Sequence, residues 1–236
     1  MFKKTPELYD LIYGGFKDYE SEAASIARLV ANLAPDASTV LDVACGTGSH
    51  IAHLRRSHGL LADGLDIERG FLDLARTKVP QAQFWHGDMA DFDLGTTFDA
   101  VLCLFSAVGY VRDLQRLGSA VSRFRKHLSP GGVLILEPWF TPDGWTPGGI
   151  YMHCREEESL KVVRMSHSTV EGRISRLVFH YLIGDGSGIE HRTEIHELGL
   201  FTQAEMRAAL ANAGFREVAY DPKGLTDRGL YVARAG

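Results

Sequence analysis

The sequence predicts an α/β fold, a doubly wound parallel sheet with a small antiparallel β lobe inserted late in the chain. Between residues 20 and 140, short apolar runs alternate with amphipathic stretches, as strands and helices do when they follow one another. One of these runs ends in a glycine-bearing turn that opens a helix, and from residue 141 the alternation gives way to consecutive strand-like segments. These observations favour a single domain over residues 1–236, with the lobe at residues 141–200.

Composition and charge indicate a small-molecule partner. The chain has 236 residues, of which 45% are hydrophobic and 23% are charged, so it can bury one sizeable core. Its formal net charge is −5, and it contains no dense run of Lys and Arg. Nucleic acids and anionic membranes both demand a basic surface, so neither is expected as the main partner.

The N-terminus and the cysteines predict the compartment. Residues 1–7 hold no apolar core of signal-peptide length, and no later run approaches the length of a membrane span. Cys45, Cys103 and Cys154 are odd in number and widely spaced, which is typical of reduced thiols rather than of a disulfide framework or a Cys-x-x-Cys metal site. We therefore expect a cytoplasmic protein that binds no metal.

Two helices are predicted ahead of the first strand. The stretch from Glu7 to Gly15 carries apolar and aromatic residues at helical spacing and ends in two glycines. Two interpretations of its aromatic face are open, because it could pack in the core or close over a site and exclude water. The stretch from Glu20 to Leu33 is a regular amphipathic helix that Pro35 ends.

A glycine-containing turn follows the first predicted strand, at a position that suits a nucleotide. Val40, Leu41 and Val43 predict a buried strand, and Gly46 and Gly48 follow it just before a helix. Glycines adopt backbone angles closed to other residues and let a ligand approach the main chain, while the first N–H groups of the helix point the same way. A nucleotide cofactor fits such a turn, and the alternative is a tight turn that binds nothing.

Two acidic residues narrow the kind of nucleotide. A dinucleotide fingerprint would need a third glycine where this chain has Ile51, and no Gly-Lys-Ser/Thr follows for a phosphate-binding loop. Asp66 instead ends a second strand over residues 61–66, where a ribose diol would be bound, and Asp88 follows a third strand that begins at Phe84. One acid for a ribose and one for an adenine edge leave no place for a pyrophosphate.

The histidines after the glycine turn do not predict a metal site. His50, His53 and His58 fall on the expected helix, and His50 and His53 could share a metal ion. A zinc site needs three or four ligands with orienting partners, and no cysteine or acid lies at suitable spacing nearby. We expect solvated or capping histidines.

The next elements complete the alternating pattern. The expected segments are a helix over 68–78, a strand over 98–104, a helix over 117–128, a turn at 129–132 and a fifth strand over 133–136. Residues 105–110 lie at the end of the fourth strand, and residues 137–139 lead on from the fifth. Ligands in open α/β sheets bind at the carboxyl ends of the strands, so both stretches are candidates for a pocket.

Beyond residue 141 the composition changes. The expected segments are a Pro- and Gly-rich stretch to residue 149, strands over 161–170, 173–183 and 191–200 with a hairpin turn at 184–188, a helix through Ala213, and strands over 215–220 and 230–233. Thr202 and Glu205 form a capping-box signature at the start of that helix. The lobe therefore lies between the fifth strand and the last helix.

Short blocks along the whole chain carry a resemblance to a known family. They are Leu8-Tyr9-Asp10-Leu11, Lys17-Asp18-Tyr19, Asp42-Val43-Ala44-Cys45-Gly46-Thr47-Gly48, His86-Gly87-Asp88-Met89, Phe105-Ser106-Ala107-Val108-Gly109-Tyr110, Glu137-Pro138-Trp139, Ser166-His167-Ser168 and Arg228-Gly229-Leu230. With them the sequence resembles the class I S-adenosylmethionine-dependent methyltransferases, and among these the N,N-dimethyltransferases of dTDP-aminodeoxysugar biosynthesis. Ala44 stands where the usual motif has its first glycine, a departure that several small-molecule branches share.

The resemblance implies a Rossmann-like methyltransferase fold, S-adenosyl-L-methionine as cofactor and a nucleotide-linked aminodeoxysugar as methyl acceptor. Residues 1–19 would form a lid, and the lobe at 141–200 would roof the substrate pocket and help to pair subunits in a homodimer. The residues implied for the cofactor are Tyr19, Ala44, Gly46, Gly48, Asp66, Ile67, Asp88, Met89 and Phe105. Those implied for the substrate are Tyr9, Tyr110, Trp139, His167 and Arg228.

Methyl transfer from a sulfonium needs alignment more than it needs a base. The lone pair of the nucleophile, the methyl carbon and the sulfur must lie in line while water is kept out, and effective molarities on the order of 10⁵ M or more are available to well-aligned neighbours. A neutral amine therefore requires no dedicated base. Tyr110 is the best candidate for holding the acceptor, and a role as a wall of the pocket is the alternative.

Arg228 separates the aminosugar hypothesis from its rivals. By default it is an exposed loop arginine, but the resemblance assigns it to the diphosphate of the acceptor, which a bidentate guanidinium suits. The rivals are O- or N-methylation of another small metabolite and a non-catalytic accessory protein that binds the cofactor. Phe140 stands where the resembling enzymes commonly have a second tryptophan, and this departure leaves the exact acceptor open.

Overall fold

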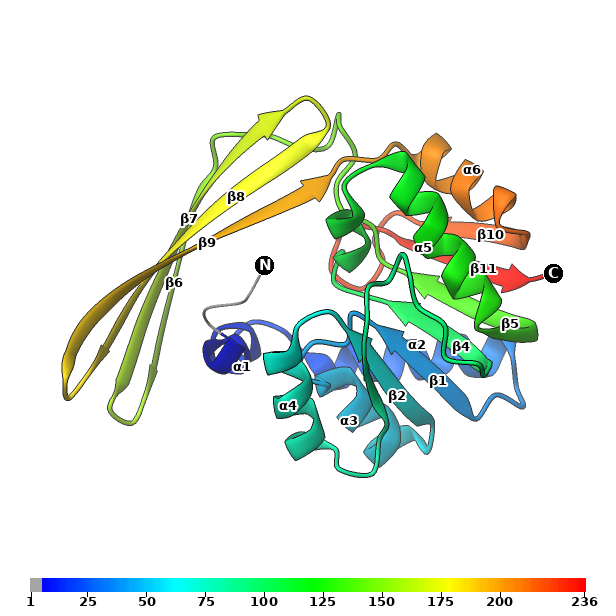
Figure 1. Cartoon of the computed structure of the whole chain (residues 1–236), viewed down its shortest axis with the longest axis horizontal. Helices are drawn as coiled ribbons and strands as arrows, with labels where there is room; N and C mark the ends of the chain where they lie inside the picture. Colours follow the sequence, from blue (N-terminus) through cyan, green and yellow to red (C-terminus); the bar gives the residue numbers. More distant parts are fainter. Residues whose placement is uncertain (1–5) are drawn as a thin grey trace.

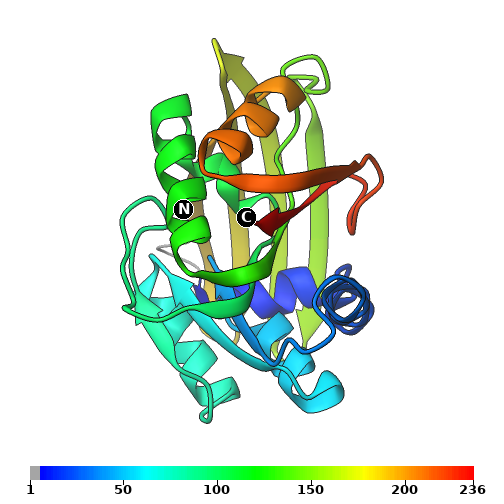
Figure 2. The same ribbon diagram turned by 90° about the vertical axis from the view of Figure 1, so that its right-hand side faces the viewer.

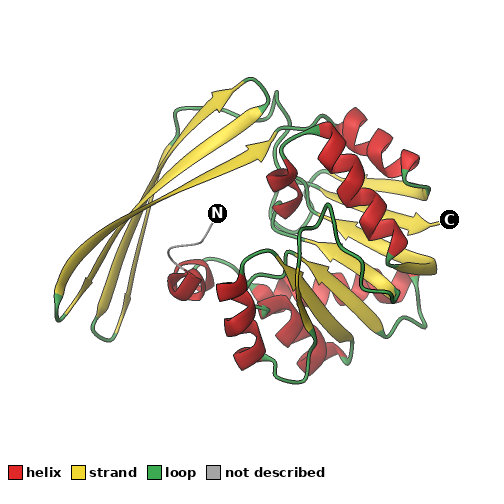
Figure 3. Cartoon of the chain, viewed as in Figure 1, coloured by secondary structure: helices red, strands yellow, loops and turns green. Residues whose placement is uncertain are grey.

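The computed structural model describes residues 6–236, which form two separate β-sheets (Figure 1). A seven-stranded, mostly parallel sheet is covered by helices, and a four-stranded antiparallel sheet stands apart from it (Figure 3). Helix α1 (Pro6–Gly14) lies between the two sheets. The predicted α/β class with an inserted antiparallel lobe is therefore confirmed.

The seven-stranded sheet consists of β1 (Thr39–Val43), β2 (Leu61–Asp66), β3 (Phe84–His86), β4 (Phe98–Cys103), β5 (Leu128–Leu136), β10 (Phe215–Asp221) and β11 (Leu230–Ala235). Their order in the sheet is β10-β11-β5-β4-β1-β2-β3. The first five strands pair in parallel, whereas β11 pairs antiparallel with both β5 and β10. The strand order reverses between β1 and β4, and open α/β sheets bind ligands in the crevice at such a point.

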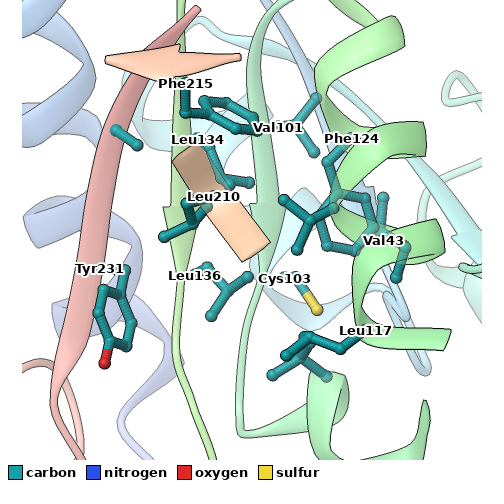
Figure 4. Packing of buried hydrophobic residues seen from close by; sticks show 14 of the residues in the cluster. Val43, Val101, Cys103, Leu117, Phe124, Leu134, Leu136, Leu210, Phe215 and Tyr231 are labelled. Carbon is teal, nitrogen blue, oxygen red and sulfur yellow. The ribbon is translucent and has the colours of Figure 1, made fainter. Parts of the chain in front are cut away.

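Helices cover both faces of this sheet. They are α2 (Tyr19–Leu33), α3 (Ser49–His58), α4 (Arg69–Lys78), α5 (Leu114–Lys126), α6 (Gln203–Asn212) and the short 3₁₀ helix η1 (Ala107–Val111). Because alternate side chains of a strand point to opposite faces, Leu41 packs with α5 and α6 while Val40 packs with α2 and α3. Figure 4 shows the first of these cores, where Phe124 of α5 and Leu210 of α6 meet the strands. No helix of the described residues is long and apolar enough to cross a membrane.

The second sheet consists of β6 (Ile150–Glu157), β7 (Leu160–Glu171), β8 (Ile174–Asp185) and β9 (Gly188–Gly199), paired antiparallel in that order. Its inner face packs Phe179 and Tyr181 against Leu8 and Ile12 of α1. Figure 2 looks from the side of the seven-stranded sheet and shows the second sheet standing behind it. Helix α1 thus fills the space where the two sheets face each other.

Three segments differ from the predictions. No strand is predicted over residues 150–157, because β6 is an edge strand without a fully buried residue and lacks a regular apolar alternation. Helix α5 begins at Leu114 rather than at residue 117, because Asp113 caps it by accepting from the N–H of Arg116 at 2.8 Å. The turn predicted at 129–132 lies inside β5, where the register with β4 shifts and Gly131 has a φ of 76°.

The predicted capping box of α6 is confirmed. The hydroxyl of Thr202 accepts from the N–H of Glu205 at 3.2 Å, and the carboxylate of Glu205 accepts from the N–H of Thr202 at 2.8 Å. The guanidinium of Arg173, together with these bonds to Thr202, lowers the pKa of Glu205 to about 2. The helix that follows the second sheet therefore starts at the residue that its local sequence indicates.

Candidate active site

A cavity of about 330 Å³ lies at the carboxyl ends of β1, β2 and β4, where the strand order reverses. Its walls come from the glycine turn, from α1, from η1 and from the inner face of the second sheet. The predicted site residues that line it are Tyr9, Ala44, Gly46, Asp66, Ile67, Asp88, Met89, Phe105, Tyr110, Trp139 and Arg228. The fold thus gathers residues from every part of the chain around one space.

The glycine turn between β1 and α3 has a left-handed backbone at several positions. The φ angle is 56° at Gly46, 75° at Gly48 and 62° at Ala44. A Cβ added at Gly46 would meet no atom within 4 Å, so the space beside this cavity residue is open to a ligand. A Cβ at Gly48 would lie 3.2 Å from that of Ala75, so Gly48 serves the packing of α3 on α4 and does not line the cavity.

Asp66 at the end of β2 is held by the backbone around it. Its Oδ2 accepts from the N–H of Gly46 at 2.8 Å, and its Oδ1 accepts from the N–H of Glu68 at 2.8 Å. Burial raises the pKa of this carboxyl group to about 6 in spite of the two bonds. Each oxygen retains a second lone pair, and Asp66 lines the cavity, so two neighbouring hydroxyls of a ribose could donate to it.

Asp88, which follows β3, pairs with an arginine that the sequence does not single out. Its Oδ1 accepts from the N–H of Ala90 at 2.9 Å, and its Oδ2 accepts from Nη2 of Arg116 at 2.6 Å. Arg116 comes from α5 and lines the same cavity. Nearby, Ile67 leaves 42% of its surface exposed on the cavity wall, an apolar patch that a flat ring such as adenine would cover.

Asp42 in β1 indicates that a cation belongs in this site. Its side chain is buried, and neither carboxylate oxygen has a hydrogen-bond partner among the described residues. Burial, and to a smaller extent the charge of Asp66, raises the pKa of Asp42 to about 8. Asp42 lines a small second cavity together with Lys17, Tyr19 and the glycine turn. An unpaired buried carboxylate is costly, so the ammonium group of a ligand would stabilise the site.

These features fit S-adenosylmethionine. Asp66 would accept from its ribose, Asp88 lies beside an apolar wall for its adenine, and Asp42 offers a carboxylate to the ammonium of its methionine part. Tyr19, predicted for the cofactor, lines the small cavity beside Asp42 rather than the large one. When bound, the cofactor would supply a methyl group on a sulfonium, activated for transfer to a nucleophile.

His50 is buried, which corrects the expectation of solvated or capping histidines on α3. Its Nε2 lies 2.8 Å from Oε2 of Glu22, and the ammonium of Lys17 donates to the same oxygen at 2.6 Å. This cluster ties the start of α2 to the start of α3, while His53 is half-buried and His58 is exposed. Within residues 6–236, no three His, Cys, Asp or Glu side chains gather so that they could hold a metal ion.

Helix α1 is fastened across the glycine turn by polar contacts. Asp10 accepts from the hydroxyl of Thr47 at 2.5 Å and from the ammonium of Lys78 at 2.7 Å. Tyr9, on the same helix, lines both cavities. Helix α1 therefore forms a wall of the cofactor side, whereas residues 1–5 of the expected lid lie outside the described residues.

Arg228 lies among aromatic rings on the other side of the cavity. Its guanidinium carbon is 5.0 Å from the ring centre of Phe105 and 5.2 Å from that of Trp139, and its Nη1 donates to Oγ of Ser106 at 3.4 Å. Glu137 is buried and follows β5 directly. Its carboxylate accepts from the backbone N–H of Phe105 at 2.6 Å and so fixes the position of this residue. Arg228 is thus half-buried in the site and is not an exposed loop residue.

Two further polar residues of the cavity come from the second sheet and are missed by the sequence analysis. Arg164 of β7 is 5% exposed, and its guanidinium carbon lies 5.0 Å from the ring centre of Tyr13 and 4.9 Å from that of Phe179. Its Nε and Nη1 have no hydrogen-bond partner in the described part of the chain. His196 of β9 is buried, and its Nδ1 lies 2.7 Å from the hydroxyl of Tyr110.

His167 does not reach the cavity, which corrects its assignment to the substrate. Successive side chains of a strand point to opposite faces, and it is Ser166 that lines the cavity. His167 is exposed on the outer face of β7, where it pairs in register with Ile150 and Val178. Arg164 lies two residues before Ser166 and therefore on the same face of β7. The alternation of a strand would have identified it once the inner face was known.

Comparison with known proteins gives consistent matches over the whole chain. A family model described as a methyltransferase domain matches residues 40–132. The dTDP-3-amino-3,4,6-trideoxy-alpha-D-glucopyranose N,N-dimethyltransferase of Streptomyces venezuelae is 43% identical over 228 residues, which cover 96% of this chain and 95% of that protein.

Two solved structures share the fold and a substantial part of the sequence. The crystal structure of Streptomyces venezuelae DesVI superposes with a TM-score of 0.92 at 42% identity and covers 98% of each chain. CalS10 of Micromonospora echinaspora is an amino pentose methyltransferase involved in calicheamicin biosynthesis, and its structure contains bound S-adenosylmethionine. It superposes with a TM-score of 0.88 at 40% identity over 97% of each chain.

Replacement of Asp42 by Asn should change how stability depends on pH. Folding raises the pKa of Asp42 from 3.8 to about 8, so the folded protein holds the proton more tightly than the unfolded chain does. Without cofactor, the contribution of the Asp42 carboxyl to the free energy of unfolding therefore decreases as the pH rises from about 4 to 8. In Asp42→Asn this contribution is absent, so the melting temperature of the unliganded variant should fall less than that of the wild type between about pH 5 and 8.

The same variant should bind S-adenosylmethionine about tenfold or more weakly in calorimetry, because a hydrogen bond to a charged group contributes roughly 1.5–3 kcal/mol. The matched control is Asp36→Asn, which changes an exposed carboxylate and should leave both measurements as in the wild type. Wild-type affinity in Asp42→Asn would remove Asp42 from the cofactor site.

Proposed function

The chain belongs to the family of S-adenosylmethionine-dependent sugar N,N-dimethyltransferases, and from this membership we propose that it methylates the amino group of a dTDP-linked aminodeoxysugar. It is an enzyme, a methyltransferase whose cofactor is S-adenosyl-L-methionine. The relative from Streptomyces venezuelae is named for a 3-amino sugar of this kind. We carry over the substrate class to this chain and leave the position of the amine to experiment.

A pair of arginines in an otherwise aromatic cavity is the observation that carries the proposal. Arg164 is buried and two of its nitrogens have no hydrogen-bond partner among the described residues, while Arg228 is half-buried beside Phe105 and Trp139. A buried guanidinium without an anion is costly. The diphosphate of a nucleotide-linked sugar offers the planar, bidentate partner that guanidinium groups prefer.

The shape of the site suits transfer to an amine. Positioning supplies most of the rate in an in-line displacement, and the amine must approach where water is excluded. Helix α1 and the second sheet line the cavity with apolar and aromatic side chains, among them Tyr13, Phe179 and Leu198. Tyr110 lies in η1, the short helix that follows β4. It would hold the amine in this space without acting as a base.

The proposal is tested by incubating the protein with labelled S-adenosylmethionine and a panel of acceptors. The panel holds dTDP-linked 3-amino and 4-amino deoxysugars, the matching free aminosugars, and a dTDP-sugar with a hydroxyl group in place of the amine. We expect mass spectrometry to find one and then two methyl groups on a nucleotide-linked aminosugar. Preference for a free sugar would contradict the diphosphate contact, and methylation of the hydroxyl compound would favour O-methyl transfer.

Removal of either arginine should weaken binding of the acceptor alone. Arg228→Ala and Arg164→Met should each raise the KM for the nucleotide-linked aminosugar about tenfold or more, because a charge-assisted phosphate contact contributes roughly 1.5–3 kcal/mol. Met retains the apolar packing of Arg164 while removing its charge. Cofactor affinity in calorimetry should stay near that of the wild type.

Arg28→Ala, on the exposed side of α2, is the control and should leave the KM unchanged. The diphosphate assignment is wrong if Arg228→Ala and Arg164→Met both use the substrate as well as the wild type does.

A homodimer formed through the second sheet is part of the same proposal. The outer face of this sheet exposes a set of large apolar side chains, Ile150, Met152, Met165, Leu182 and Ile195, with 41% to 66% of their surface accessible. They lie on one face because residues two apart in a strand, and residues paired directly across neighbouring strands, point to the same side of the sheet. An exposed face with several large apolar side chains favours burial against a second copy of the chain.

Met165→Glu should therefore shift the protein from dimer to monomer, because a charge at the centre of an apolar interface would have to be buried without a partner. Sedimentation or light scattering of the purified protein measures the change. Ser122→Glu, on the exposed side of α5, adds the same charge elsewhere and should not alter the mass. A wild-type protein that is monomeric at micromolar concentration would contradict the homodimer.

For the compartment we propose the cytoplasm. Cys45 and Cys103 are buried free thiols in or beside the main sheet, and Cys154 is a free thiol on β6. A reducing compartment keeps thiols in this state. Cell fractionation with an antibody to the protein would test the assignment.

A further inference from the structure

A hydrogen bond joins the two sheets inside the cavity. The hydroxyl of Tyr110 lies 2.7 Å from Nδ1 of His196. Tyr110 belongs to η1, which follows β4, whereas His196 belongs to β9 of the second sheet. Both side chains line the cavity, and His196 is almost completely buried. The contact therefore lies where the acceptor would be held.

The surroundings of His196 fix the direction of this bond. Its Nε2 lies 3.7 Å from Oε2 of Glu194, an oxygen that also accepts from the hydroxyl of Tyr181 at 3.3 Å, and both Glu194 and His196 are buried. A carboxylate attracts an N–H, so it favours the proton on Nε2. Burial lowers the pKa of His196 and outweighs the opposing effect of the Glu194 carboxylate, so the neutral ring is favoured. Its Nδ1 is then an acceptor, and Tyr110 must donate to it.

This direction decides what Tyr110 can offer to a ligand. A tyrosine hydroxyl has one proton and two lone pairs. With the proton directed at His196, only lone pairs remain, so the oxygen can accept from an amine N–H. It cannot donate to the amine nitrogen, whose lone pair stays free to attack a methyl group.

The number of N–H groups changes with each transfer. A primary amine has two and a secondary amine has one, whereas a neutral tertiary amine has none. Each transfer forms a C–N bond as the sulfonium C–S bond breaks, and the resulting ammonium must give one proton to water before the nitrogen can react again. An acceptor-only hydroxyl can therefore hold the nitrogen for a first and a second transfer, and it has no N–H to hold for a third.

Resting on the proposed function, we propose that His196 is a positioning residue that fixes Tyr110 as a hydrogen-bond acceptor and orients the substrate amine for two transfers, while the neutral tertiary amine has no N–H by which Tyr110 could hold it for a third. The Glu194 carboxylate in turn keeps His196 in the required tautomer. The second sheet thus takes part in the reaction through His196, which acts on the amine by way of Tyr110.

The first test compares variants on an aminosugar nucleotide that the wild type dimethylates. Tyr110→Phe and His196→Leu should each lower kcat about tenfold or more, with KM within about threefold of the wild type. Because His196 acts through Tyr110, the double variant should be no worse than Tyr110→Phe within about twofold. His196→Asn, whose amide oxygen can accept near the place of Nδ1, should recover most of the loss. The control His191→Leu changes an exposed histidine of the same strand and should retain wild-type kcat.

The products give a second measure. The secondary amine has a single N–H through which Tyr110 can hold it, so the second transfer depends on this bond more than the first. His196→Leu should therefore accumulate the monomethylated sugar, whereas the wild type and His196→Asn should proceed to the dimethylated one. Mass spectrometry of a time course measures the ratio.

A third measure needs neither substrate nor cofactor. Long-range ¹H–¹⁵N spectra of histidine-labelled protein should show His196 as the neutral tautomer with the proton on Nε2. The inference is overturned by a proton on Nδ1, by losses that add in the double variant, or by an Asn variant that is no better than the Leu variant. Failure of the wild type to methylate any aminosugar nucleotide would instead overturn the proposed function, and the tautomer would then decide this inference by itself.

Discussion

The site depends on the hydrogen bonds that hold the glycine turn against the end of β2. Asp66 accepts from the N–H of Gly46, while the N–H groups of Ala44 and Cys45 donate to the carbonyl of Leu65. A left-handed residue such as Ala44 costs about 1–2 kcal/mol, and these bonds offset that cost. Because the turn is fixed in this shape, α1 can be fastened to it and the second sheet can rest on α1 and η1. The walls of the cavity on the side of the second sheet follow from that contact.

Two buried ionisable side chains keep polar atoms without a hydrogen-bond partner. Asp42 and Arg164 both have unpaired polar atoms among the described residues, the first beside the glycine turn and the second on the inner face of β7. In its charged form each would destabilise the unliganded fold, since an unpaired buried charge is costly, and the raised pKa of Asp42, about 8, lets this carboxyl stay protonated at neutral pH. Their signs are opposite and complement an ammonium on the cofactor side and a diphosphate on the acceptor side. Binding of the cofactor and the acceptor would supply the partners that these two side chains lack in the unliganded protein.

The main sheet and the cofactor side could be predicted from the sequence because their signals are local. The apolar strand and the glycines of residues 40–48 lie next to each other in the chain, and Asp66 and Asp88 follow their own strands directly. In a parallel sheet the carboxyl ends of the strands meet at one edge, so residues that end strands meet without further knowledge of the fold. The capping box at Thr202 was predictable for the same reason.

The acceptor side was decided by the tertiary structure. Side chains of a strand alternate between the two faces of a sheet, so the sequence of β7 does not determine whether His167 or its neighbours point inward. In the structure, Arg164 and Ser166 line the cavity. The bond between Tyr110 and His196 depends on how the second sheet docks on η1, and no local pattern encodes that distance. The sequence by itself determined the fold class, the cofactor and the family. Only packing between segments distant in the chain determined which polar groups face the acceptor, because that choice depends on sheet register and docking rather than on neighbouring residues.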